Sequence, residues 1–105
     1  MSKLKDEKSI LIVGGYGIVG IQIASILRQW HPTMPLIIAG RDLKKGKEFA
    51  ETLGYAEAVA MDVTKVNQIS PLNGKLAAVA SATNDPNNYI LLNTIKNNVP
   101  YIDVT

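Results

Sequence analysis

Two hydrophobic patterns alternate along this chain of 105 residues. Short runs rich in Ile, Val and Ala have the length and composition of strands that are buried on both faces of a parallel sheet. Five such runs are present, at residues 9–13, 35–40, 56–63, 76–81 and 101–104. Three of the segments between them show the 3.6-residue period of amphipathic helices, and no linker or low-complexity stretch divides the chain.

The first helical segment follows four glycines and reaches about residue 30. Its polar stripe starts at Gln22 and Ser25 and continues to Gln29. The opposite, apolar face is formed by Val19, Ile23, Ile26, Leu27 and Trp30. This pattern predicts a helix that packs on a sheet. The glycines argue against a membrane span, because each weakens a helix by roughly 1 kcal/mol.

Two further helices carry start and stop signals. Asp42 is a candidate N-cap for a helix that stops at Gly54. Its predicted inner face consists of Leu43, Gly46, Ala50 and Leu53. Asp85 and Pro86 have the pattern of an N-cap and a first helical residue. The inner face of that helix is predicted to contain Leu91, Leu92 and Ile95. The segment 66–72, by contrast, has room for no more than a turn or two of helix.

This alternation of strands and helices predicts a single α/β domain spanning residues 1–105. Right-handed crossovers place helices on both faces of a parallel sheet. We predict a Rossmann-type doubly wound parallel sheet of five strands in the order 3-2-1-4-5. In such a sheet a ligand lies across the carboxyl ends of the strands, where the order reverses between strands 1 and 4.

The segment GYGIVG, residues 15–20, matches the dinucleotide-binding pattern G-x-G-x-x-G in its required place between a strand and a helix. Gly15 is expected to permit the tight turn, Gly17 to let the backbone approach a pyrophosphate, and Gly20 to let the helix pack close to the sheet. The side chains between these glycines are Tyr16, Ile18 and Val19, which complete the predicted binding turn. The helix N-terminus offers N–H groups and a partial positive charge to the phosphates. A glycine turn without a ligand is the alternative interpretation.

The residues after strand 2 bear on the choice between NADP and NAD. An NAD site normally has Asp or Glu there to bind the ribose 2′-hydroxyl, but this chain has Gly40 and Arg41. A guanidinium binds a 2′-phosphate through paired hydrogen bonds, whereas a carboxylate repels it. Asp42, one position later, is also a candidate for the ribose, although its role as a helix cap competes. The pattern favours NADP and leaves NAD open.

The ends of strands 3 and 4 supply the other candidate contacts. Asp62 and Val63 are expected to border the adenine, while capping of the following turn is an equally good role for Asp62. Ser81, Ala82, Thr83 and Asn84 are expected near the nicotinamide half, where small side chains leave room.

Composition limits the remaining chemistry. The formal net charge is only +2 and the N-terminal lysines alternate with acidic residues, so nucleic acid is not an expected partner. The chain has no cysteine, and no metal-ligand cluster stands out. His31, the only histidine, is expected in a solvated loop at the edge opposite the cofactor. The Tyr-x-x-x-Lys pair of short-chain reductases is absent, so no residue is predicted to be catalytic and no metal is expected.

These features resemble the N-terminal NAD(P)-binding domain of the saccharopine dehydrogenase-like reductases, from about Ile10 to the last residue. The similar segments are ILIVGGYGIVG, AGRDLKKGKEFAETLG, AVAMDVT and, most specifically, NNVPYIDVT with its Tyr-x-Asp. The segment SATNDPNN departs from the family, because it lacks the Pro-Phe that often follows strand 4. The resemblance implies hydride transfer between a nicotinamide and an amino-acid-like or imine substrate, and with the Arg41 argument we expect that cofactor to be NADP(H).

The resemblance also implies a substrate domain after strand 5, so we expect this chain to be a truncated cofactor module that is inactive alone. Its implied partners are the dinucleotide and, in a full-length protein, a small-molecule substrate, with a homodimer left open. Because no export or membrane signal is present, we expect a cytoplasmic protein. A non-catalytic dinucleotide-sensing domain with a reductase-like fold is the alternative function.

Overall fold

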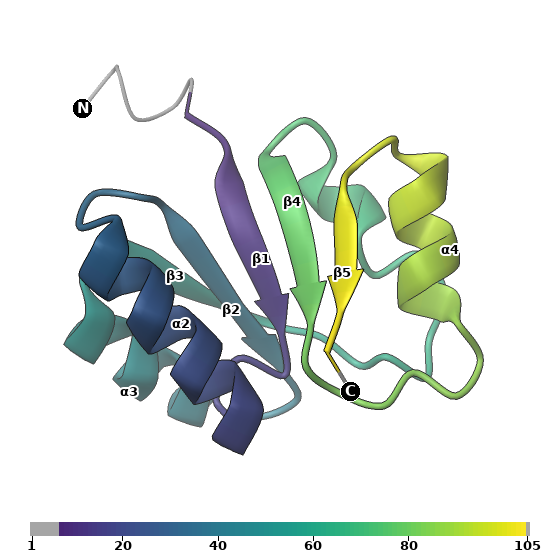
Figure 1. The fold of residues 1–105 in the computed structure, drawn as a ribbon. Helices are drawn as coiled ribbons and strands as arrows, with labels where there is room; N and C mark the ends of the chain where they lie inside the picture. The colour runs from purple at the N-terminus through teal and green to yellow at the C-terminus, as the bar shows by residue number, and fades with distance from the viewer. Residues whose placement is uncertain (1–6, 105) are drawn as a thin grey trace.

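Within residues 7–104, which the computed structural model describes, five parallel strands form a sheet in the order β3-β2-β1-β4-β5 (Figure 1). The strands are β1 (Ser9–Val13), β2 (Leu36–Gly40), β3 (Ala56–Ala60), β4 (Leu76–Ser81) and β5 (Tyr101–Asp103). The helices of this part of the chain are α2 (Ile18–Trp30), α3 (Leu43–Leu53) and α4 (Tyr89–Lys96), with a short 3-10 helix η1 (Ser70–Leu72). The predicted Rossmann-type fold and its strand order are confirmed.

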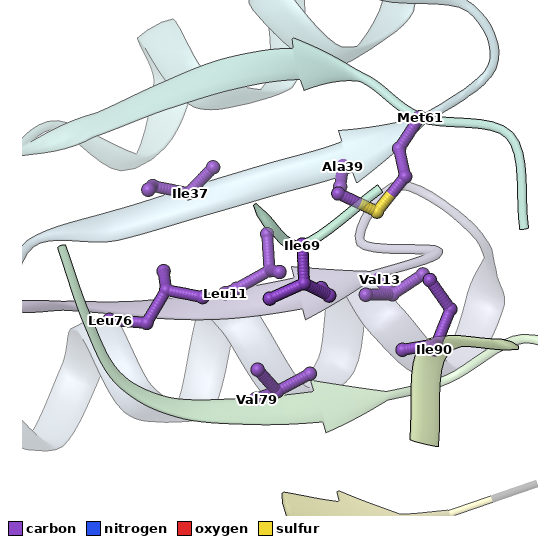
Figure 2. Close-up of a cluster of buried hydrophobic side chains, with 9 residues drawn as sticks. All are labelled: Leu11, Val13, Ile37, Ala39, Met61, Ile69, Leu76, Val79 and Ile90. Atoms are coloured by element: carbon purple, nitrogen blue, oxygen red, sulfur yellow. The ribbon is translucent and has the colours of Figure 1, made fainter. Parts of the chain in front are cut away.

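Two apolar clusters cover the two faces of the sheet. The cluster on the side of η1 and α4 contains Leu11, Val13, Ile37, Ala39, Met61, Ile69, Leu76, Val79 and Ile90 (Figure 2). The cluster on the side of α2 and α3 contains Ile12, Ala24, Leu36, Ile38 and Ala50. Successive side chains of a strand point to opposite faces, so β1 and β2 have to be apolar at consecutive positions to supply both clusters. The prediction of helices on both faces is confirmed.

The inner face of α2 differs from the prediction. Gly20 and Ala24 are buried, and Ile23 and Leu27 are half-buried. The predicted face also included three residues that are exposed, namely Val19 at 43%, Ile26 at 55% and Trp30 at 74%. The small buried residues let the helix backbone lie close to the sheet, so only a narrow stripe of α2 faces the core.

An apolar groove of about 570 Å³ lies beside α2, over β4 and β5. Its lining includes Ile10, Ile23, Ile26, Leu27, Ala78, Ala80, Pro100 and Ile102. Ile26 and Ile102 are more than half exposed, so this part of the sheet face is open to solvent among the described residues. Part of the apolar side of α2 therefore faces the groove instead of the core.

The predicted limits of α3 agree with the structure. The Asp42 carboxylate accepts a hydrogen bond from the Lys45 N–H at 3.2 Å, as an N-cap does. Gly54 follows the last turn with a φ of +72°, a conformation that favours glycine. β3, in contrast, ends at Ala60 and is shorter than predicted. Its partner β2 ends opposite it at Gly40, so no ladder continues beyond that point.

The start of α4 also differs from the prediction, since the helix begins at Tyr89 and not at Pro86. Asn88 has a left-handed conformation with a φ of +58°, which interrupts any helix that would begin at Pro86. Asp85 still caps the helix, although it lies four residues before Tyr89. Its carboxylate accepts hydrogen bonds from the N–H groups of Tyr89 at 3.0 Å and Ile90 at 2.9 Å.

A buried polar residue sets the orientation of α4. Asn93 Oδ1 accepts hydrogen bonds from the N–H groups of Ile69 at 2.8 Å and Ser70 at 3.1 Å, and its Nδ2 donates to Ser70 Oγ. The buried side of α4 consists of Ile90, Asn93 and Thr94. The predicted inner face is wrong, because Leu92 and Ile95 are 58% and 60% exposed. Leu91, its third member, is half-buried.

Candidate functional site

A depression of about 510 Å³ lies at the carboxyl ends of the strands, where the order reverses between β1 and β4. The strand arrows of Figure 1 point toward this edge. The ends of β1 and β2 and the loops after four strands line it: Val13, Gly14, Tyr16 and Gly17; Gly40 and Arg41; Met61, Asp62, Val63 and Thr64; Ala82, Thr83, Asn84 and Pro86. We refer to it as the carboxyl-end depression.

The structure brings many of the predicted site residues together around this depression. Those that line it are Tyr16, Gly17, Arg41, Asp62, Val63, Ala82, Thr83 and Asn84. The predicted residues that do not line it are Gly15, Ile18, Val19, Gly20, Asp42 and Ser81. The remaining lining residues, which were not predicted as contacts, are Val13, Gly14, Gly40, Met61, Thr64 and Pro86. Extending the predicted strands by one residue would have found Gly14 and Thr64, whereas Val13 and Met61 lie within the predicted strands.

The turn after β1 is made by a different glycine from the one expected. Gly14 has a φ of +78°, whereas Gly15 does not have a positive φ. The N–H groups of both residues donate to Ala39 O, at 2.8 and 3.2 Å, and so hold the turn against β2. Gly15 is required for another reason, because a Cβ there would lie 2.8 Å from Ile38 Cγ2. Gly14 supplies the left-handed backbone, and Gly15 permits close packing on β2.

Gly17 and Gly20 have contrasting surroundings. Gly17 is the N-cap of α2, and a Cβ at this position would meet only Gly14 O, at 3.4 Å. A Cβ at Gly20 would overlap Gly14 O and lie 2.7 Å from Gly15 Cα. Gly20 therefore allows α2 to contact the backbone of the glycine turn, whereas the space around Gly17 opens on the carboxyl-end depression.

No side chain within residues 7–104 caps the N-terminus of α2. Gly17 provides no capping oxygen, and the first turn of the helix contains no acidic residue. Ile18 is 83% exposed and Val19 43%, so the first turn is open to solvent. The first backbone N–H groups of a helix have no partner within it, so this end attracts an anion.

The corner between β2 and α3 presents one cation to the depression. Arg41 lines the depression, is exposed, and makes no hydrogen bond or salt bridge among residues 7–104. The Asp42 carboxylate instead caps α3, as the competing prediction had it. The Asp42 N–H donates a hydrogen bond of 2.6 Å to Tyr16 Oη, which links the corner to the glycine turn.

The carboxylate of Asp62 is engaged in a local turn. Its Oδ1 accepts hydrogen bonds from Thr64 Oγ1 at 2.6 Å and from the Thr64 N–H at 2.9 Å. The hydroxyl bond is the largest cause of a lowered pKa at Asp62, and the nearby charges of Lys65 and Arg41 lower it further. The hydrogen bonds of Asp62 support the prediction that it caps the following turn. The residue also lines the depression.

The end of β4 places small residues at the depression. Ala82 N–H donates to Val13 O at 2.8 Å, which continues the pairing with β1. Ala82 and Thr83 line the depression. Ser81 is fully buried, and its Oγ donates to Thr83 O at 3.3 Å. Ser81 therefore stabilises the loop after β4 without lining the depression.

The Tyr-x-Asp segment of β5 does not line the carboxyl-end depression. Tyr101 Oη donates to Asp103 Oδ2 at 3.4 Å. Burial raises the pKa of the Tyr101 hydroxyl, and the Asp103 charge raises it further.

Other candidate chemistry is sparse in the described part of the chain. His31 is the exposed C-cap of α2, at the opposite end of that helix from Gly17. Among residues 7–104, no group of three His, Cys, Asp or Glu side chains is arranged to hold a metal ion. No helix in the same residues is long and apolar enough to cross a bilayer.

Comparisons with known proteins show a likeness of fold. No family model and no curated protein sequence matches the chain. Among solved structures, apo histidine-tagged saccharopine dehydrogenase (L-Glu forming) from Saccharomyces cerevisiae matches with a TM-score of 0.78 and 18% identity. The match covers 91% of this chain and 21% of that one.

Two reductase structures match less extensively. A short chain dehydrogenase/reductase family protein and a putative betaketoacyl-ACP reductase each match with a TM-score of 0.59 and 20% identity. Each match covers 74% of this chain and 34% of the other. The chain thus has the fold found in these proteins and spans about a fifth to a third of their length.

Proposed function

We propose that this domain binds NADP(H) and is the cofactor-binding part of an oxidoreductase. The observation that carries the proposal is the uncapped N-terminus of α2, which meets a glycine turn beside the carboxyl-end depression. Backbone N–H groups and the helix dipole together favour a phosphate at such a place. The location at the reversal of strand order is the usual one for a ligand in an open α/β sheet.

Each part of a dinucleotide has a place in the depression under this proposal. The pyrophosphate lies at Gly17, where a backbone without Cβ allows close approach. The adenosine half lies between Arg41 and the Asp62–Val63 loop, and the nicotinamide half lies beside Ala82 and Thr83. Gly15, Gly20 and Ser81 support these loops without contacting the ligand.

Arg41 is the basis for preferring NADP(H) to NAD(H). Arg41 lines the depression, and its guanidinium makes no hydrogen bond or salt bridge within residues 7–104, so it is available for a phosphate. Hydrogen bonds between charged groups contribute about 1.5–3 kcal/mol, which corresponds to at least a tenfold difference in affinity. Asp42, the nearest carboxylate in sequence, is directed to the Lys45 N–H.

The substrate proposal rests on the sequence segments that resemble the saccharopine dehydrogenase-like reductases and on the likeness of fold to saccharopine dehydrogenase. The proposed substrate is an amino-acid-like or imine compound that exchanges hydride with the nicotinamide. A proton donor is needed for that reaction, and neither His nor Lys lines the depression in the described part of the chain. Tyr16 and Asp62 do line it, but both belong to the side proposed for the adenosine half, away from Ala82 and Thr83. The donor is therefore expected from outside residues 7–104.

Calorimetric titration with NADPH and NADH tests the cofactor assignment. We expect NADPH to bind at least tenfold more tightly than NADH, and Arg41→Ala to remove the difference by weakening NADPH alone. Lys47→Ala is the matched control, because it removes a positive charge from an exposed position of α3 outside the depression. Equal affinities for the two nucleotides in the unmodified protein would reject the NADP preference, and failure to bind either would reject the site.

A further inference from the structure

Tyr16 connects the two loops that would hold the adenosine half of a dinucleotide. It is the first variable residue of the G-x-G-x-x-G segment and packs with the apolar cluster beneath α2 and α3. Its hydroxyl accepts a 2.6 Å hydrogen bond from the Asp42 N–H, 26 residues later in the chain. The ring lies against the end of β2, because a Cβ on Gly40 would be 2.5 Å from both Tyr16 Cζ and Tyr16 Oη.

Tyr16 and Gly40 are therefore a complementary pair. The aromatic ring fills the space into which any side chain at position 40 would project. Gly46 on α3 borders the same ring, with a Cβ there 3.8 Å from Tyr16 Cδ2. The atoms that a residue 40 side chain would meet are the outer atoms of the Tyr16 ring, so the ring would have to move and give up its hydrogen bond to Asp42.

This arrangement bears on specificity, because the end of β2 is where an NAD site has its ribose-binding carboxylate. A carboxylate at position 40 is excluded while Tyr16 keeps its place. The bond from Asp42 N–H to Tyr16 Oη fixes the backbone next to Arg41, which lines the depression. Asp42 does not line it.

We infer that Tyr16 is a specificity-determining positioning residue. Its ring keeps a carboxylate out of the end of β2, and its hydroxyl holds the corner so that Arg41 faces the ribose of the dinucleotide. The inference rests on the proposed binding of NADP(H). The inference adds that the preference for NADP(H) over NAD(H) depends on Tyr16 as well as on the charge of Arg41.

The test measures the ratio of the NADH to the NADPH dissociation constant, together with the melting temperature. Tyr16→Phe keeps the ring and removes the acceptor for the Asp42 N–H. We expect the ratio to fall at least threefold with a small change in melting temperature. Tyr55→Phe is the matched control, since Tyr55 is an exposed tyrosine at the opposite end of the sheet, and should leave both quantities unchanged.

A second set of variants tests the exclusion of a carboxylate. Gly40→Asp alone is expected to lower the melting temperature, because its side chain meets the Tyr16 ring. Combining it with Tyr16→Ala should recover part of that loss. The double variant should also bind NADH at least tenfold more tightly, relative to NADPH, than Tyr16→Ala does. Should Gly40→Asp not fold, the double variant and Tyr16→Phe still decide the matter.

The outcomes separate this inference from the proposed function. A preserved NADPH preference in Tyr16→Phe, or no gain of relative NADH affinity in the double variant, would overturn the inference and leave the NADP(H) site intact. Absence of any NADPH preference in the unmodified protein would overturn the proposed cofactor choice, and the role of Tyr16 with it.

Discussion

Gly17 and Gly20 lie one helical turn apart, yet side chains at these two positions would meet different surroundings. Gly17 has a φ of −77° and a ψ of 175°, which any residue adopts, and its nearest neighbour for a Cβ is Gly14 O at 3.4 Å. Position 20 is filled by the backbone of Gly14 and Gly15. The absence of a side chain at Gly17 leaves space at the carboxyl-end depression. At Gly20 it makes room for the backbone of the glycine turn.

This contrast predicts separable effects of two substitutions. Gly17→Val should abolish NADPH binding with little loss of stability, because its side chain enters the proposed pyrophosphate position. Gly20→Val should lower the stability by about 3 kcal/mol, at the upper end of the usual range for overpacking, because backbone atoms cannot rotate away. Melting curves of both variants with and without NADPH distinguish the two roles.

The Gly17 prediction has a definite contrary result. If Gly17→Val keeps the full NADPH-induced rise in melting temperature, the glycine turn is structural and the pyrophosphate lies elsewhere. A Gly20→Val variant as stable as the unmodified protein would contradict the packing of α2 on the turn.

At the scale of elements, one polar side chain decides how α4 packs. Asn93 is 5% exposed and satisfies two backbone N–H groups at the start of η1. These bonds turn Asn93 and Thr94 toward the sheet and leave Leu92 and Ile95 outside. A helix that covers one face of the sheet is thus oriented by hydrogen bonds as well as by apolar burial.

Asn93→Leu is accordingly expected to destabilise the domain, although it replaces a polar side chain by an apolar one of similar size. The substitution leaves the N–H groups of Ile69 and Ser70 without their acceptor, at a cost of about 2–4 kcal/mol. Chemical denaturation measures the change. Asn87→Leu, at an exposed position before α4, is the control, and equal stability of the two variants would refute this role of Asn93.

At the scale of the whole molecule, the parallel sheet gathers loops that are far apart in sequence. Residues from 13 to 86 meet at one edge, because all strands end there. The lining contains the groups that we propose hold a dinucleotide. Among the described residues, it contains neither His nor Lys to donate a proton to a substrate.

We therefore expect the 105-residue chain to bind NADPH without turning over saccharopine or a related amino acid. The measurement is the change in NADPH absorbance with each candidate substrate, on a sample whose nucleotide binding has been established by calorimetry. Turnover above the background rate would contradict the inference that the proton donor lies outside the described residues.

Much of the fold is predictable from local sequence. The apolar residues of β1 and β2, the GYGIVG segment and the Asp42 and Gly54 signals depend on a residue and its near neighbours in the chain. Strand order follows from the alternation of elements and the right-handedness of their crossovers. The approximate position of the site follows from that order.

Contacts across the fold decided the remaining features. The orientation of α4 depends on Asn93 reaching residues 69 and 70, which no helical period reveals. The end of β3 depends on where β2 stops. The contact between Tyr16 and Gly40 joins two loops that meet only after the sheet has formed. A sequence determines which backbone conformations are favourable at each position, but which side chains share a space is determined by long-range packing.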